Sequence, residues 1–206
     1  MNEHYPFELP PLPYDAGALS PKIDEKTIRV HHDTLFLGYV TRLNNALKNY
    51  PQFHNWSLHR LILDNHRLPK DIRTTVYNNA GGVYNHTLYF NAMTLKYQNP
   101  SPNMMNLINR SFGSYDKFKT AMLNAGLSVF GSGWAWLAKD RNGKLVIQTT
   151  ANQDTLLPQG LLSLLPLDVW EHSYFLQYLA ARNEYIMNWF TLINWKYVEK
   201  RLSLLM

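Results

Sequence analysis

Cysteine is absent from this chain of 206 residues, and its absence limits the chemistry available. Without thiols there can be no disulfide and no thiolate-bound metal or cluster. A metal held by protein side chains must therefore be bound by histidine, aspartate or glutamate. Such a ligand set favours manganese, iron or zinc over softer ions.

Long apolar runs are missing as well. The longest one, residues 161–170, is interrupted by Ser163, Pro166 and Asp168, and it falls far short of the about 20 residues that a membrane span needs. Residues 1–13 contain two acids and four prolines but no apolar segment, so they do not resemble a signal peptide. We therefore expect a soluble, cytoplasmic protein without a membrane partner.

Runs of basic residues are also scarce, although the formal net charge is +5. The densest group, residues 196–201, is divided by Tyr197, Val198 and Glu199. This pattern argues against nucleic-acid binding, whereas a modest positive charge suits a small anionic substrate. Aromatic residues make up 14% of the chain, which indicates large buried surfaces or a dimer interface.

The N-terminal half shows helical periodicity after a proline-rich arm. Residues 1–20 are predicted to be extended because three prolines between positions 10 and 13 exclude a helix. Ser20 is followed by proline, which is typical of a helix that starts with Ser20 as its cap. The predicted helix runs to about Asn49 and carries an apolar stripe made of Ile28, His31, Leu35, Tyr39, Leu43 and Leu47. His31 therefore points inward, whereas His32 points elsewhere.

A second predicted helix carries another inward histidine. Residues 50–69 form a mixed connection with a short helix at 56–63, and its histidines are expected to be solvated: His54, His59 and His66. Residues 70–93 then form a long helix with His86 on its apolar face. Its Gly81-Gly82 pair costs about 1 kcal/mol per residue relative to alanine, so something should approach the backbone closely there. Two long helices with a modest connection predict an antiparallel hairpin.

The chain changes character after the proline-containing linker at residues 99–103, which divides it into domains at 1–98 and 99–206. Helical sequence continues to about Gly126, with Ser114 as a cap in its middle. Three segments then have strand character: 128–139, 144–150 and 164–168. Asn142-Gly143 indicates a hairpin turn, and the C-terminal part is mostly helical. The predicted fold is α+β: an N-terminal long antiparallel α-hairpin domain and a C-terminal α/β domain with a three-stranded antiparallel sheet.

Asp168 and His172 lie four residues apart where the third strand ends. With 15 acids and 8 histidines in 206 residues, such a pair is expected about 0.6 times by chance. A lone buried histidine is also more often a hydrogen-bonded core residue than a ligand. Together with His31 and His86, however, the pair offers three imidazoles and a carboxylate, with room for a solvent ligand. The chain has no His-Glu-x-x-His motif of the zinc hydrolases, so manganese or iron is favoured.

Several motifs, taken in order, resemble the iron/manganese superoxide dismutase family over essentially the whole chain. They lie at residues 7–14, 31–33, 39–40, 78–82, 85–86, 131–137, 151–154 and 168–172. Each motif is modest alone, but their joint order is specific. The resemblance implies conversion of superoxide to dioxygen and hydrogen peroxide. One manganese ion per subunit, with iron as the alternative, would cycle by one electron.

The same resemblance assigns the inner residues of a metal centre. The implied metal ligands are His31, His86, Asp168 and His172. Gln153 matches the outer-sphere amide that hydrogen-bonds the solvent ligand, and Tyr39 matches the gateway phenol beside it. The aromatic wall is matched by Trp134, Trp136 and Trp170.

Residues further out are assigned in the same way. Arg182 and Tyr185 match an outer pair near the active-site entrance. Glu171 matches the residue that crosses a dimer interface to His172 of the partner subunit. The resemblance therefore implies a homodimer, with a tetramer as the alternative.

Some positions depart from the family pattern. Leu35 and Phe36 replace two histidines of many members, and Phe175 replaces the tyrosine that pairs with the first of them. Both ends of a polar contact are thus apolar, so we expect a repacked interface and an altered proton supply or rate. Gly82 together with Gln153 resembles the manganese branch, whereas Val83-Tyr84 resembles the iron branch.

Two rival functions use the same residues. One is a non-catalytic metal-binding or structural protein on the same fold, and the other is a metal-dependent hydrolase or oxygenase. Metal identity and superoxide turnover distinguish them, because zinc would indicate a hydrolase.

Overall fold

The computed structural model describes residues 4–203, so the first three residues of the predicted arm lie outside the described part. Residues 4–24 contain no helix or strand, as the prolines predict. The arm is fixed to the first helix by two hydrogen bonds between the Phe7 backbone and the Asn44 side chain, each 2.8 Å long. Phe7 itself is buried in the core.

The first long helix begins later than the sequence predicts. It consists of α1 (Glu25–Arg29), a π-helical segment η1 (Val30–Phe36) and α2 (Leu37–Leu47). Its cap is Asp24, whose carboxylate accepts a hydrogen bond from the Thr27 backbone at 2.6 Å. The assignment of Ser20 as the cap is therefore wrong, because residues 16–22 form turns and Asp24 satisfies the free N–H groups instead.

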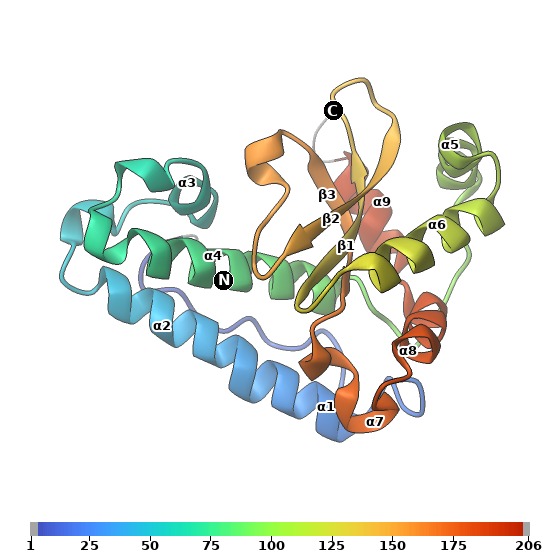
Figure 1. Ribbon diagram of the computed structural model, residues 1–206, viewed down its shortest axis with the longest axis horizontal. Helices are drawn as coiled ribbons and strands as arrows, with labels where there is room; N and C mark the ends of the chain where they lie inside the picture. Colours follow the sequence, from blue (N-terminus) through green and yellow to red (C-terminus); the bar gives the residue numbers. More distant parts are fainter. Residues whose placement is uncertain (1–3, 204–206) are drawn as a thin grey trace.

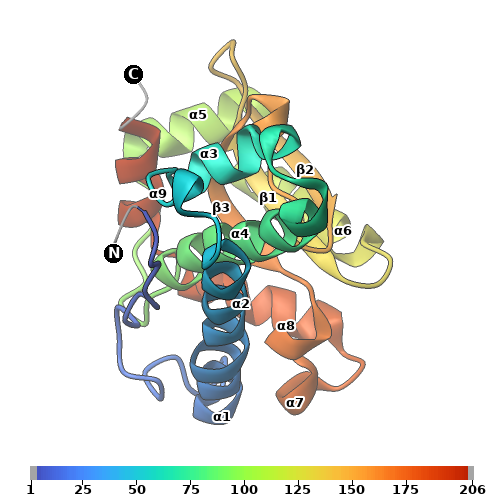
Figure 2. The same ribbon diagram turned by 90° about the vertical axis from the view of Figure 1, so that its left-hand side faces the viewer.

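The second long helix, α4 (Lys70–Asn91), packs along α2 as the predicted hairpin (Figure 1), and α4 lies above α2 in the turned view as well (Figure 2). Between them lie the short helices η2 (Pro51–Phe53), α3 (Leu58–Leu63) and η3 (Asn65–Arg67). His59 and His66 are exposed, as predicted. His54 is not solvated, because its ring stacks on Tyr5 with centroids 3.8 Å apart and its Nε2 lies 2.9 Å from the Leu47 carbonyl.

The C-terminal half holds a three-stranded antiparallel sheet in the order β2-β1-β3 (Figure 1). Its strands are β1 (Gly133–Lys139), β2 (Leu145–Ala151) and β3 (Leu162–Asp168). Before the sheet come α5 (Pro102–Phe112) and α6 (Tyr115–Ser128), with Ser101 and Ser114 as their caps. The predicted strand at 128–139 starts too early, since Gly131 takes a φ of 75° that breaks extended pairing.

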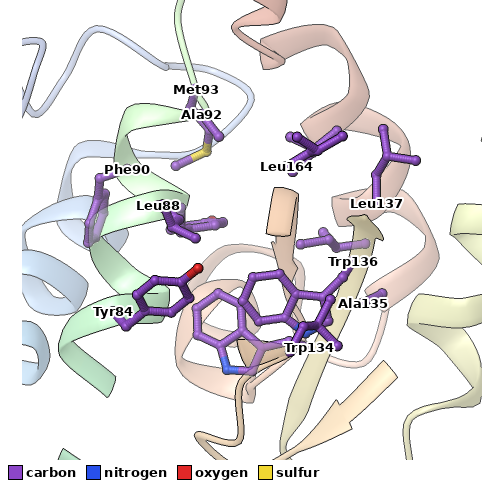
Figure 3. Close-up of a cluster of buried hydrophobic side chains, with 14 of the residues drawn as sticks. Tyr84, Leu88, Phe90, Ala92, Met93, Trp134, Ala135, Trp136, Leu137 and Leu164 are labelled. Carbon is purple, nitrogen blue, oxygen red and sulfur yellow. The ribbon is translucent and has the colours of Figure 1, made fainter. Parts of the chain in front are cut away.

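The short helices that remain all follow β2, and one of them, α9, packs against β3. They are η4 (Leu157–Gln159), η5 (Glu171–Ser173), α7 (Phe175–Tyr178), α8 (Arg182–Trp189), η6 (Phe190–Leu192) and α9 (Trp195–Ser203). Figure 3 shows the contact between the two halves, where Trp134, Trp136 and Leu164 of the sheet face Tyr84 and Leu88 of α4. The α+β fold class is confirmed. Among the described helices, none is long and apolar enough to cross a membrane.

Candidate metal centre

The hairpin places two histidines opposite each other. His31 lies in the π-helical segment of the first helix and His86 in the middle of α4, and both are fully buried. Their ring centroids are 4.9 Å apart at an angle of 87°. A π-helical turn contains an extra residue, which rotates the side chains that follow relative to an α-helix. The π-helical segment thus coincides with His31, the histidine of the first helix that belongs to the cluster.

Asp168 and His172 approach from the sheet side. Asp168 is the last residue of β3 and is fully buried, and His172 follows in η5. The backbone N–H of Trp170 donates to Asp168 Oδ1 at 2.9 Å, which leaves Oδ2 for other partners. A strand end followed by a tight turn thus directs both side chains to one point.

The four side chains converge on a single small volume. Nε2 of His31 and Nε2 of His172 each lie 3.3 Å from Asp168 Oδ2, and Nε2 of His86 lies 3.9 Å from it. One donor atom from each residue lies within 4.8 Å of the others. Metal–ligand bonds of about 2.0–2.2 Å would place such atoms on one ion.

Two buried imidazole nitrogens have no hydrogen-bond partner among the described residues, which indicates that this site holds a further group. Nε2 of His31 and Nε2 of His86 are buried, and neither makes a hydrogen bond with any residue in the described part of the chain. His86 Nδ1 lies 2.7 Å from the Gly82 carbonyl, a contact that makes Nδ1 the donor and leaves the Nε2 lone pair free. Buried polar atoms without partners are costly, so this donor set fits a metal ion.

Burial also sets the charge of the donors. Burial, followed by the nearby His172, lowers the pKa of His31 to about 4. The pKa of His86 lies well below its usual value for the same reason, with His31 as the next cause. Burial by itself would raise the pKa of Asp168, but His172 and His31 outweigh it and hold that pKa below its usual value. At neutral pH His31 and His86 are therefore neutral and Asp168 is a carboxylate, the forms that bind metal.

A short hydrogen-bonded chain leads away from the cluster. Gln153 Nε2 donates to the Tyr39 hydroxyl at 3.0 Å, and Gln153 Oε1 accepts from Asn85 Nδ2 at 3.1 Å. The Tyr39 ring lies 5.1 Å from the His86 ring and is partly exposed. Burial raises the pKa of Tyr39, so its phenol keeps its proton.

The glycine pair in α4 makes this arrangement possible. A Cβ atom at Gly81 would lie 2.2 Å from the Gln153 carbonyl oxygen, and one at Gly82 would lie 2.5 Å from the Tyr39 ring. Both contacts are shorter than van der Waals packing allows. The close approach expected from the sequence is therefore present, and Gln153 and Tyr39 are the groups that approach.

Three tryptophans lie around the cluster at different depths. The Trp134 ring meets the His86 ring edge-on at 5.3 Å, and the Trp170 ring stacks on His172 at 5.3 Å. Trp136 lies behind Trp134 with centroids 5.6 Å apart, and its indole N–H donates to Thr150 at 3.0 Å. Trp134 and Trp136 are fully buried, whereas the His172 side chain is 16% exposed.

The outer residues occupy distinct places. The Tyr185 hydroxyl donates to the Asp168 carbonyl at 2.9 Å and is fully buried beneath the cluster, not at an entrance. Arg182 donates to the Tyr174 hydroxyl at 3.0 Å and to the Val129 carbonyl at 2.8 Å, so it joins α8 to the loop before β1. The Glu171 side chain is exposed and has no hydrogen bond or ion pair within residues 4–203.

Two contributors were missed by the sequence reasoning. Asn85 holds Gln153, and Tyr89 lies beside the His31 ring at 5.2 Å while its hydroxyl is 3.0 Å from that of Tyr185. Asn85 directly precedes His86 in the motif at residues 85–86, so this motif could have indicated a role for Asn85. Tyr89 had only helical spacing from His86, and such spacing also fits an ordinary core residue.

A buried site of three imidazoles and one carboxylate, between a helical hairpin and a three-stranded sheet, defines a two-domain mononuclear metalloprotein. Family comparison agrees. Residues 6–94 match the alpha-hairpin domain of the iron/manganese superoxide dismutases, and residues 100–201 match their C-terminal domain.

Two curated relatives come from Leptolyngbya boryana. Superoxide dismutase [Mn] 3 is 42% identical over 197 residues, 95% of this chain and 82% of that protein. Superoxide dismutase [Mn] 1 is 44% identical over 199 residues, 95% of this chain and 80% of that protein. The chain belongs to the iron/manganese superoxide dismutase family, as its motifs predict.

Proposed function

We propose that this chain is a superoxide dismutase with one manganese ion per subunit, bound by His31, His86, Asp168 and His172. The observation that carries the proposal is the convergence of four buried donors on one point, with two imidazole nitrogens left without partners. The names of both relatives include manganese, and Gly82 with Gln153 fits that branch. Iron is the alternative metal.

The bound metal would supply one-electron cycling, in which one superoxide is oxidised to dioxygen and another is reduced to hydrogen peroxide. The second product requires two protons, which the protein must deliver. Tyr39 is partly exposed and protonated, and its hydroxyl accepts from Gln153. The phenol proton is therefore free to point toward the site. We assign Tyr39 as the gateway and Gln153 as the amide that positions it.

The aromatic residues have a different role. Trp134 against His86 and Trp170 against His172 cover the donors with apolar surface. A water-poor site strengthens each electrostatic interaction inside it. Trp136 supports Trp134 from behind. Tyr185 fixes Asp168 through its backbone carbonyl, so it acts as a positioning residue.

We also propose a homodimer whose seam contains Glu171. Glu171 precedes three exposed apolar side chains: Phe175 (47% exposed), Leu176 (48%) and Leu179 (62%). Phe130 (103% exposed) lies in the loop that Arg182 holds through the carbonyl groups of Val129 and Gly131, and we propose that these side chains form one face. Large exposed apolar patches of this kind are typical of protein interfaces. Glu171 would reach His172 of the partner subunit.

Three further proposals concern the domain boundary, the location of the protein and its substrate. We place the boundary between the two domains at residues 98 and 99, where the linker leads to the Ser101 cap of α5. We also propose a cytoplasmic location. Superoxide is the proposed substrate, and the positive net charge favours its approach.

Elemental analysis of the native protein, paired with superoxide consumption by manganese- and iron-reconstituted samples, tests the function. We expect about one manganese per chain and rapid turnover of the manganese form. Stoichiometric manganese or iron without turnover would instead support the non-catalytic metal-binding protein. Native zinc would support a hydrolase.

A further inference from the structure

A cleft of about 440 Å³ lies away from the metal centre, where the two domains meet again. In Figure 1, α3 faces the segment with η4 that leads into β3, and the cleft lies between these elements, the β1–β2 turn and α9. None of the four candidate ligands lines it. Its volume lies within the roughly 300–1,000 Å³ range of small-molecule sites.

Positive charge dominates the cleft. Lys139 ends β1, Arg141 lies in the turn after it and Arg201 lies on α9, so three cations come from three segments. Within residues 4–203 none of the three forms an ion pair. The one carboxylate of the lining, Asp140, accepts two backbone hydrogen bonds of 2.9 Å from its own turn. Unpaired cations that converge on a concave surface are suited to an anion.

Two of the cations have defined neighbours. Arg201 Nε donates to the Ser163 carbonyl at 2.9 Å, and its guanidinium also interacts with the Tyr197 hydroxyl. The Arg141 guanidinium lies over Gly160, where a Cβ atom would come within 2.6 Å of Nη2. Gly160 has a φ of 68°, which favours glycine, and its lack of a side chain leaves room for Arg141. Prior ordering lowers the entropic cost of binding a ligand.

The hairpin domain contributes the opposite wall. The His59 and Tyr84 rings meet edge-on with centroids 5.4 Å apart, and both line the cleft. Burial lowers the pKa of His59, and the charge of Arg201 lowers it further. The cleft thus combines an aromatic wall with a titratable group that faces Arg201, Lys139, Arg141 and Asp140. A bound anion would offset the charge of Arg201 and so raise the pKa of His59.

We propose that this cleft binds a small anion with two or more phosphate groups, of the pyrophosphate class. A phosphate group carries roughly −1.5 to −2 charges at pH 7 and three strong acceptor oxygens. Arginine guanidinium groups match such oxygens with paired donors. A diphosphate can contact the arginines of the C-terminal domain and His59 of the hairpin domain at once, so it would join the two domains.

Calorimetric titration of the metal-loaded protein with pyrophosphate tests the site. We expect saturable 1:1 binding that weakens about tenfold in Arg141→Gln, and about a hundredfold in the double variant Lys139→Gln/Arg141→Gln. Arg110→Gln is the matched control, because Arg110 is also exposed but lies outside the cleft. Superoxide turnover of Arg141→Gln should equal that of the unchanged protein, which separates this site from the metal centre.

Repeating the titration at about pH 6 in two buffers of different ionisation enthalpy gives a second readout. Binding to the unchanged protein should take up more protons than binding to His59→Gln, because the anion raises the pKa of His59, whereas the titration of the phosphate groups is common to both proteins. Absence of saturable binding, equal weakening by Arg110→Gln and Arg141→Gln, or tighter binding of citrate than of pyrophosphate would each overturn the proposal.

Discussion

Asp168 is the residue on which the metal centre depends most. It is the one carboxylate of the described donor cluster, and its Oδ2 is within 3.9 Å of all three imidazoles. Asp168→Ala should therefore abolish retention of manganese and iron, as measured by elemental analysis after dialysis. Asp116→Ala, at an exposed position on α6, should retain the metal. A variant that still binds stoichiometric metal without Asp168 would show that the ligand assignment is wrong.

Gln153 acts through other groups. Its side chain joins Asn85 to Tyr39 and belongs to no donor set. Gln153→Ala should lower kcat about 10- to 100-fold while metal content stays unchanged, because outer partners tune a site without holding the ion. Gln148→Ala, on the exposed face of β2, provides a control that should keep full turnover. Loss of metal in parallel with kcat would contradict the role given to Gln153.

At the scale of elements, the close contact of α4 with the segment around Gln153 limits what α4 can contain. Gly81→Ala would force its Cβ against a backbone carbonyl 2.2 Å away, which cannot move as a side chain can. We expect a loss of about 1–3 kcal/mol in the free energy of unfolding, despite the higher helix propensity of alanine. Urea denaturation measures the change.

Gly38→Ala on α2 provides the comparison. There the nearest atom, 2.9 Å away, is the end of the flexible Arg42 side chain. This variant should be neutral or more stable, by up to about 1 kcal/mol. Equal losses in the two variants would mean that the contact with Gln153 does not determine the requirement for glycine.

The π-helical segment illustrates the limit of prediction at this scale. The stripe from Ile28 to Leu47 correctly placed a long helix with an inward His31. The π-helical segment Val30–Phe36 shifts the positions that follow, so Phe36 and Val40 are buried where the stripe predicted Leu35 and Tyr39. His32, which was predicted to point elsewhere, is buried as well. An apolar stripe that assumes 3.6 residues per turn cannot indicate this change of helix type. The early strand start at residue 128 has a similar origin, since the conformation of Gly131 is not visible in an apolar pattern.

For the whole molecule, the exposed apolar face predicts association. Phe175→Asp should shift the protein from dimer to monomer in sedimentation velocity, because a charge would be buried in the seam. Leu63→Asp, at 48% exposure against 47% for Phe175, places the same charge on α3 away from that face. Dimers that persist in Phe175→Asp would contradict the proposed seam.

The sequence by itself determined the composition of the metal centre and the order of the elements. The absence of cysteine restricted the donors to imidazole and carboxylate, helical periods placed His31 and His86 at inward positions, and the family motifs added Asp168. Such periods depend on local geometry, so they can be read without the fold. Only the tertiary structure brought donors 137 positions apart, at residues 31 and 168, to within 3.3 Å. It alone joined Arg201 to the cleft opposite His59, because contacts between distant segments depend on how helices and sheet pack together.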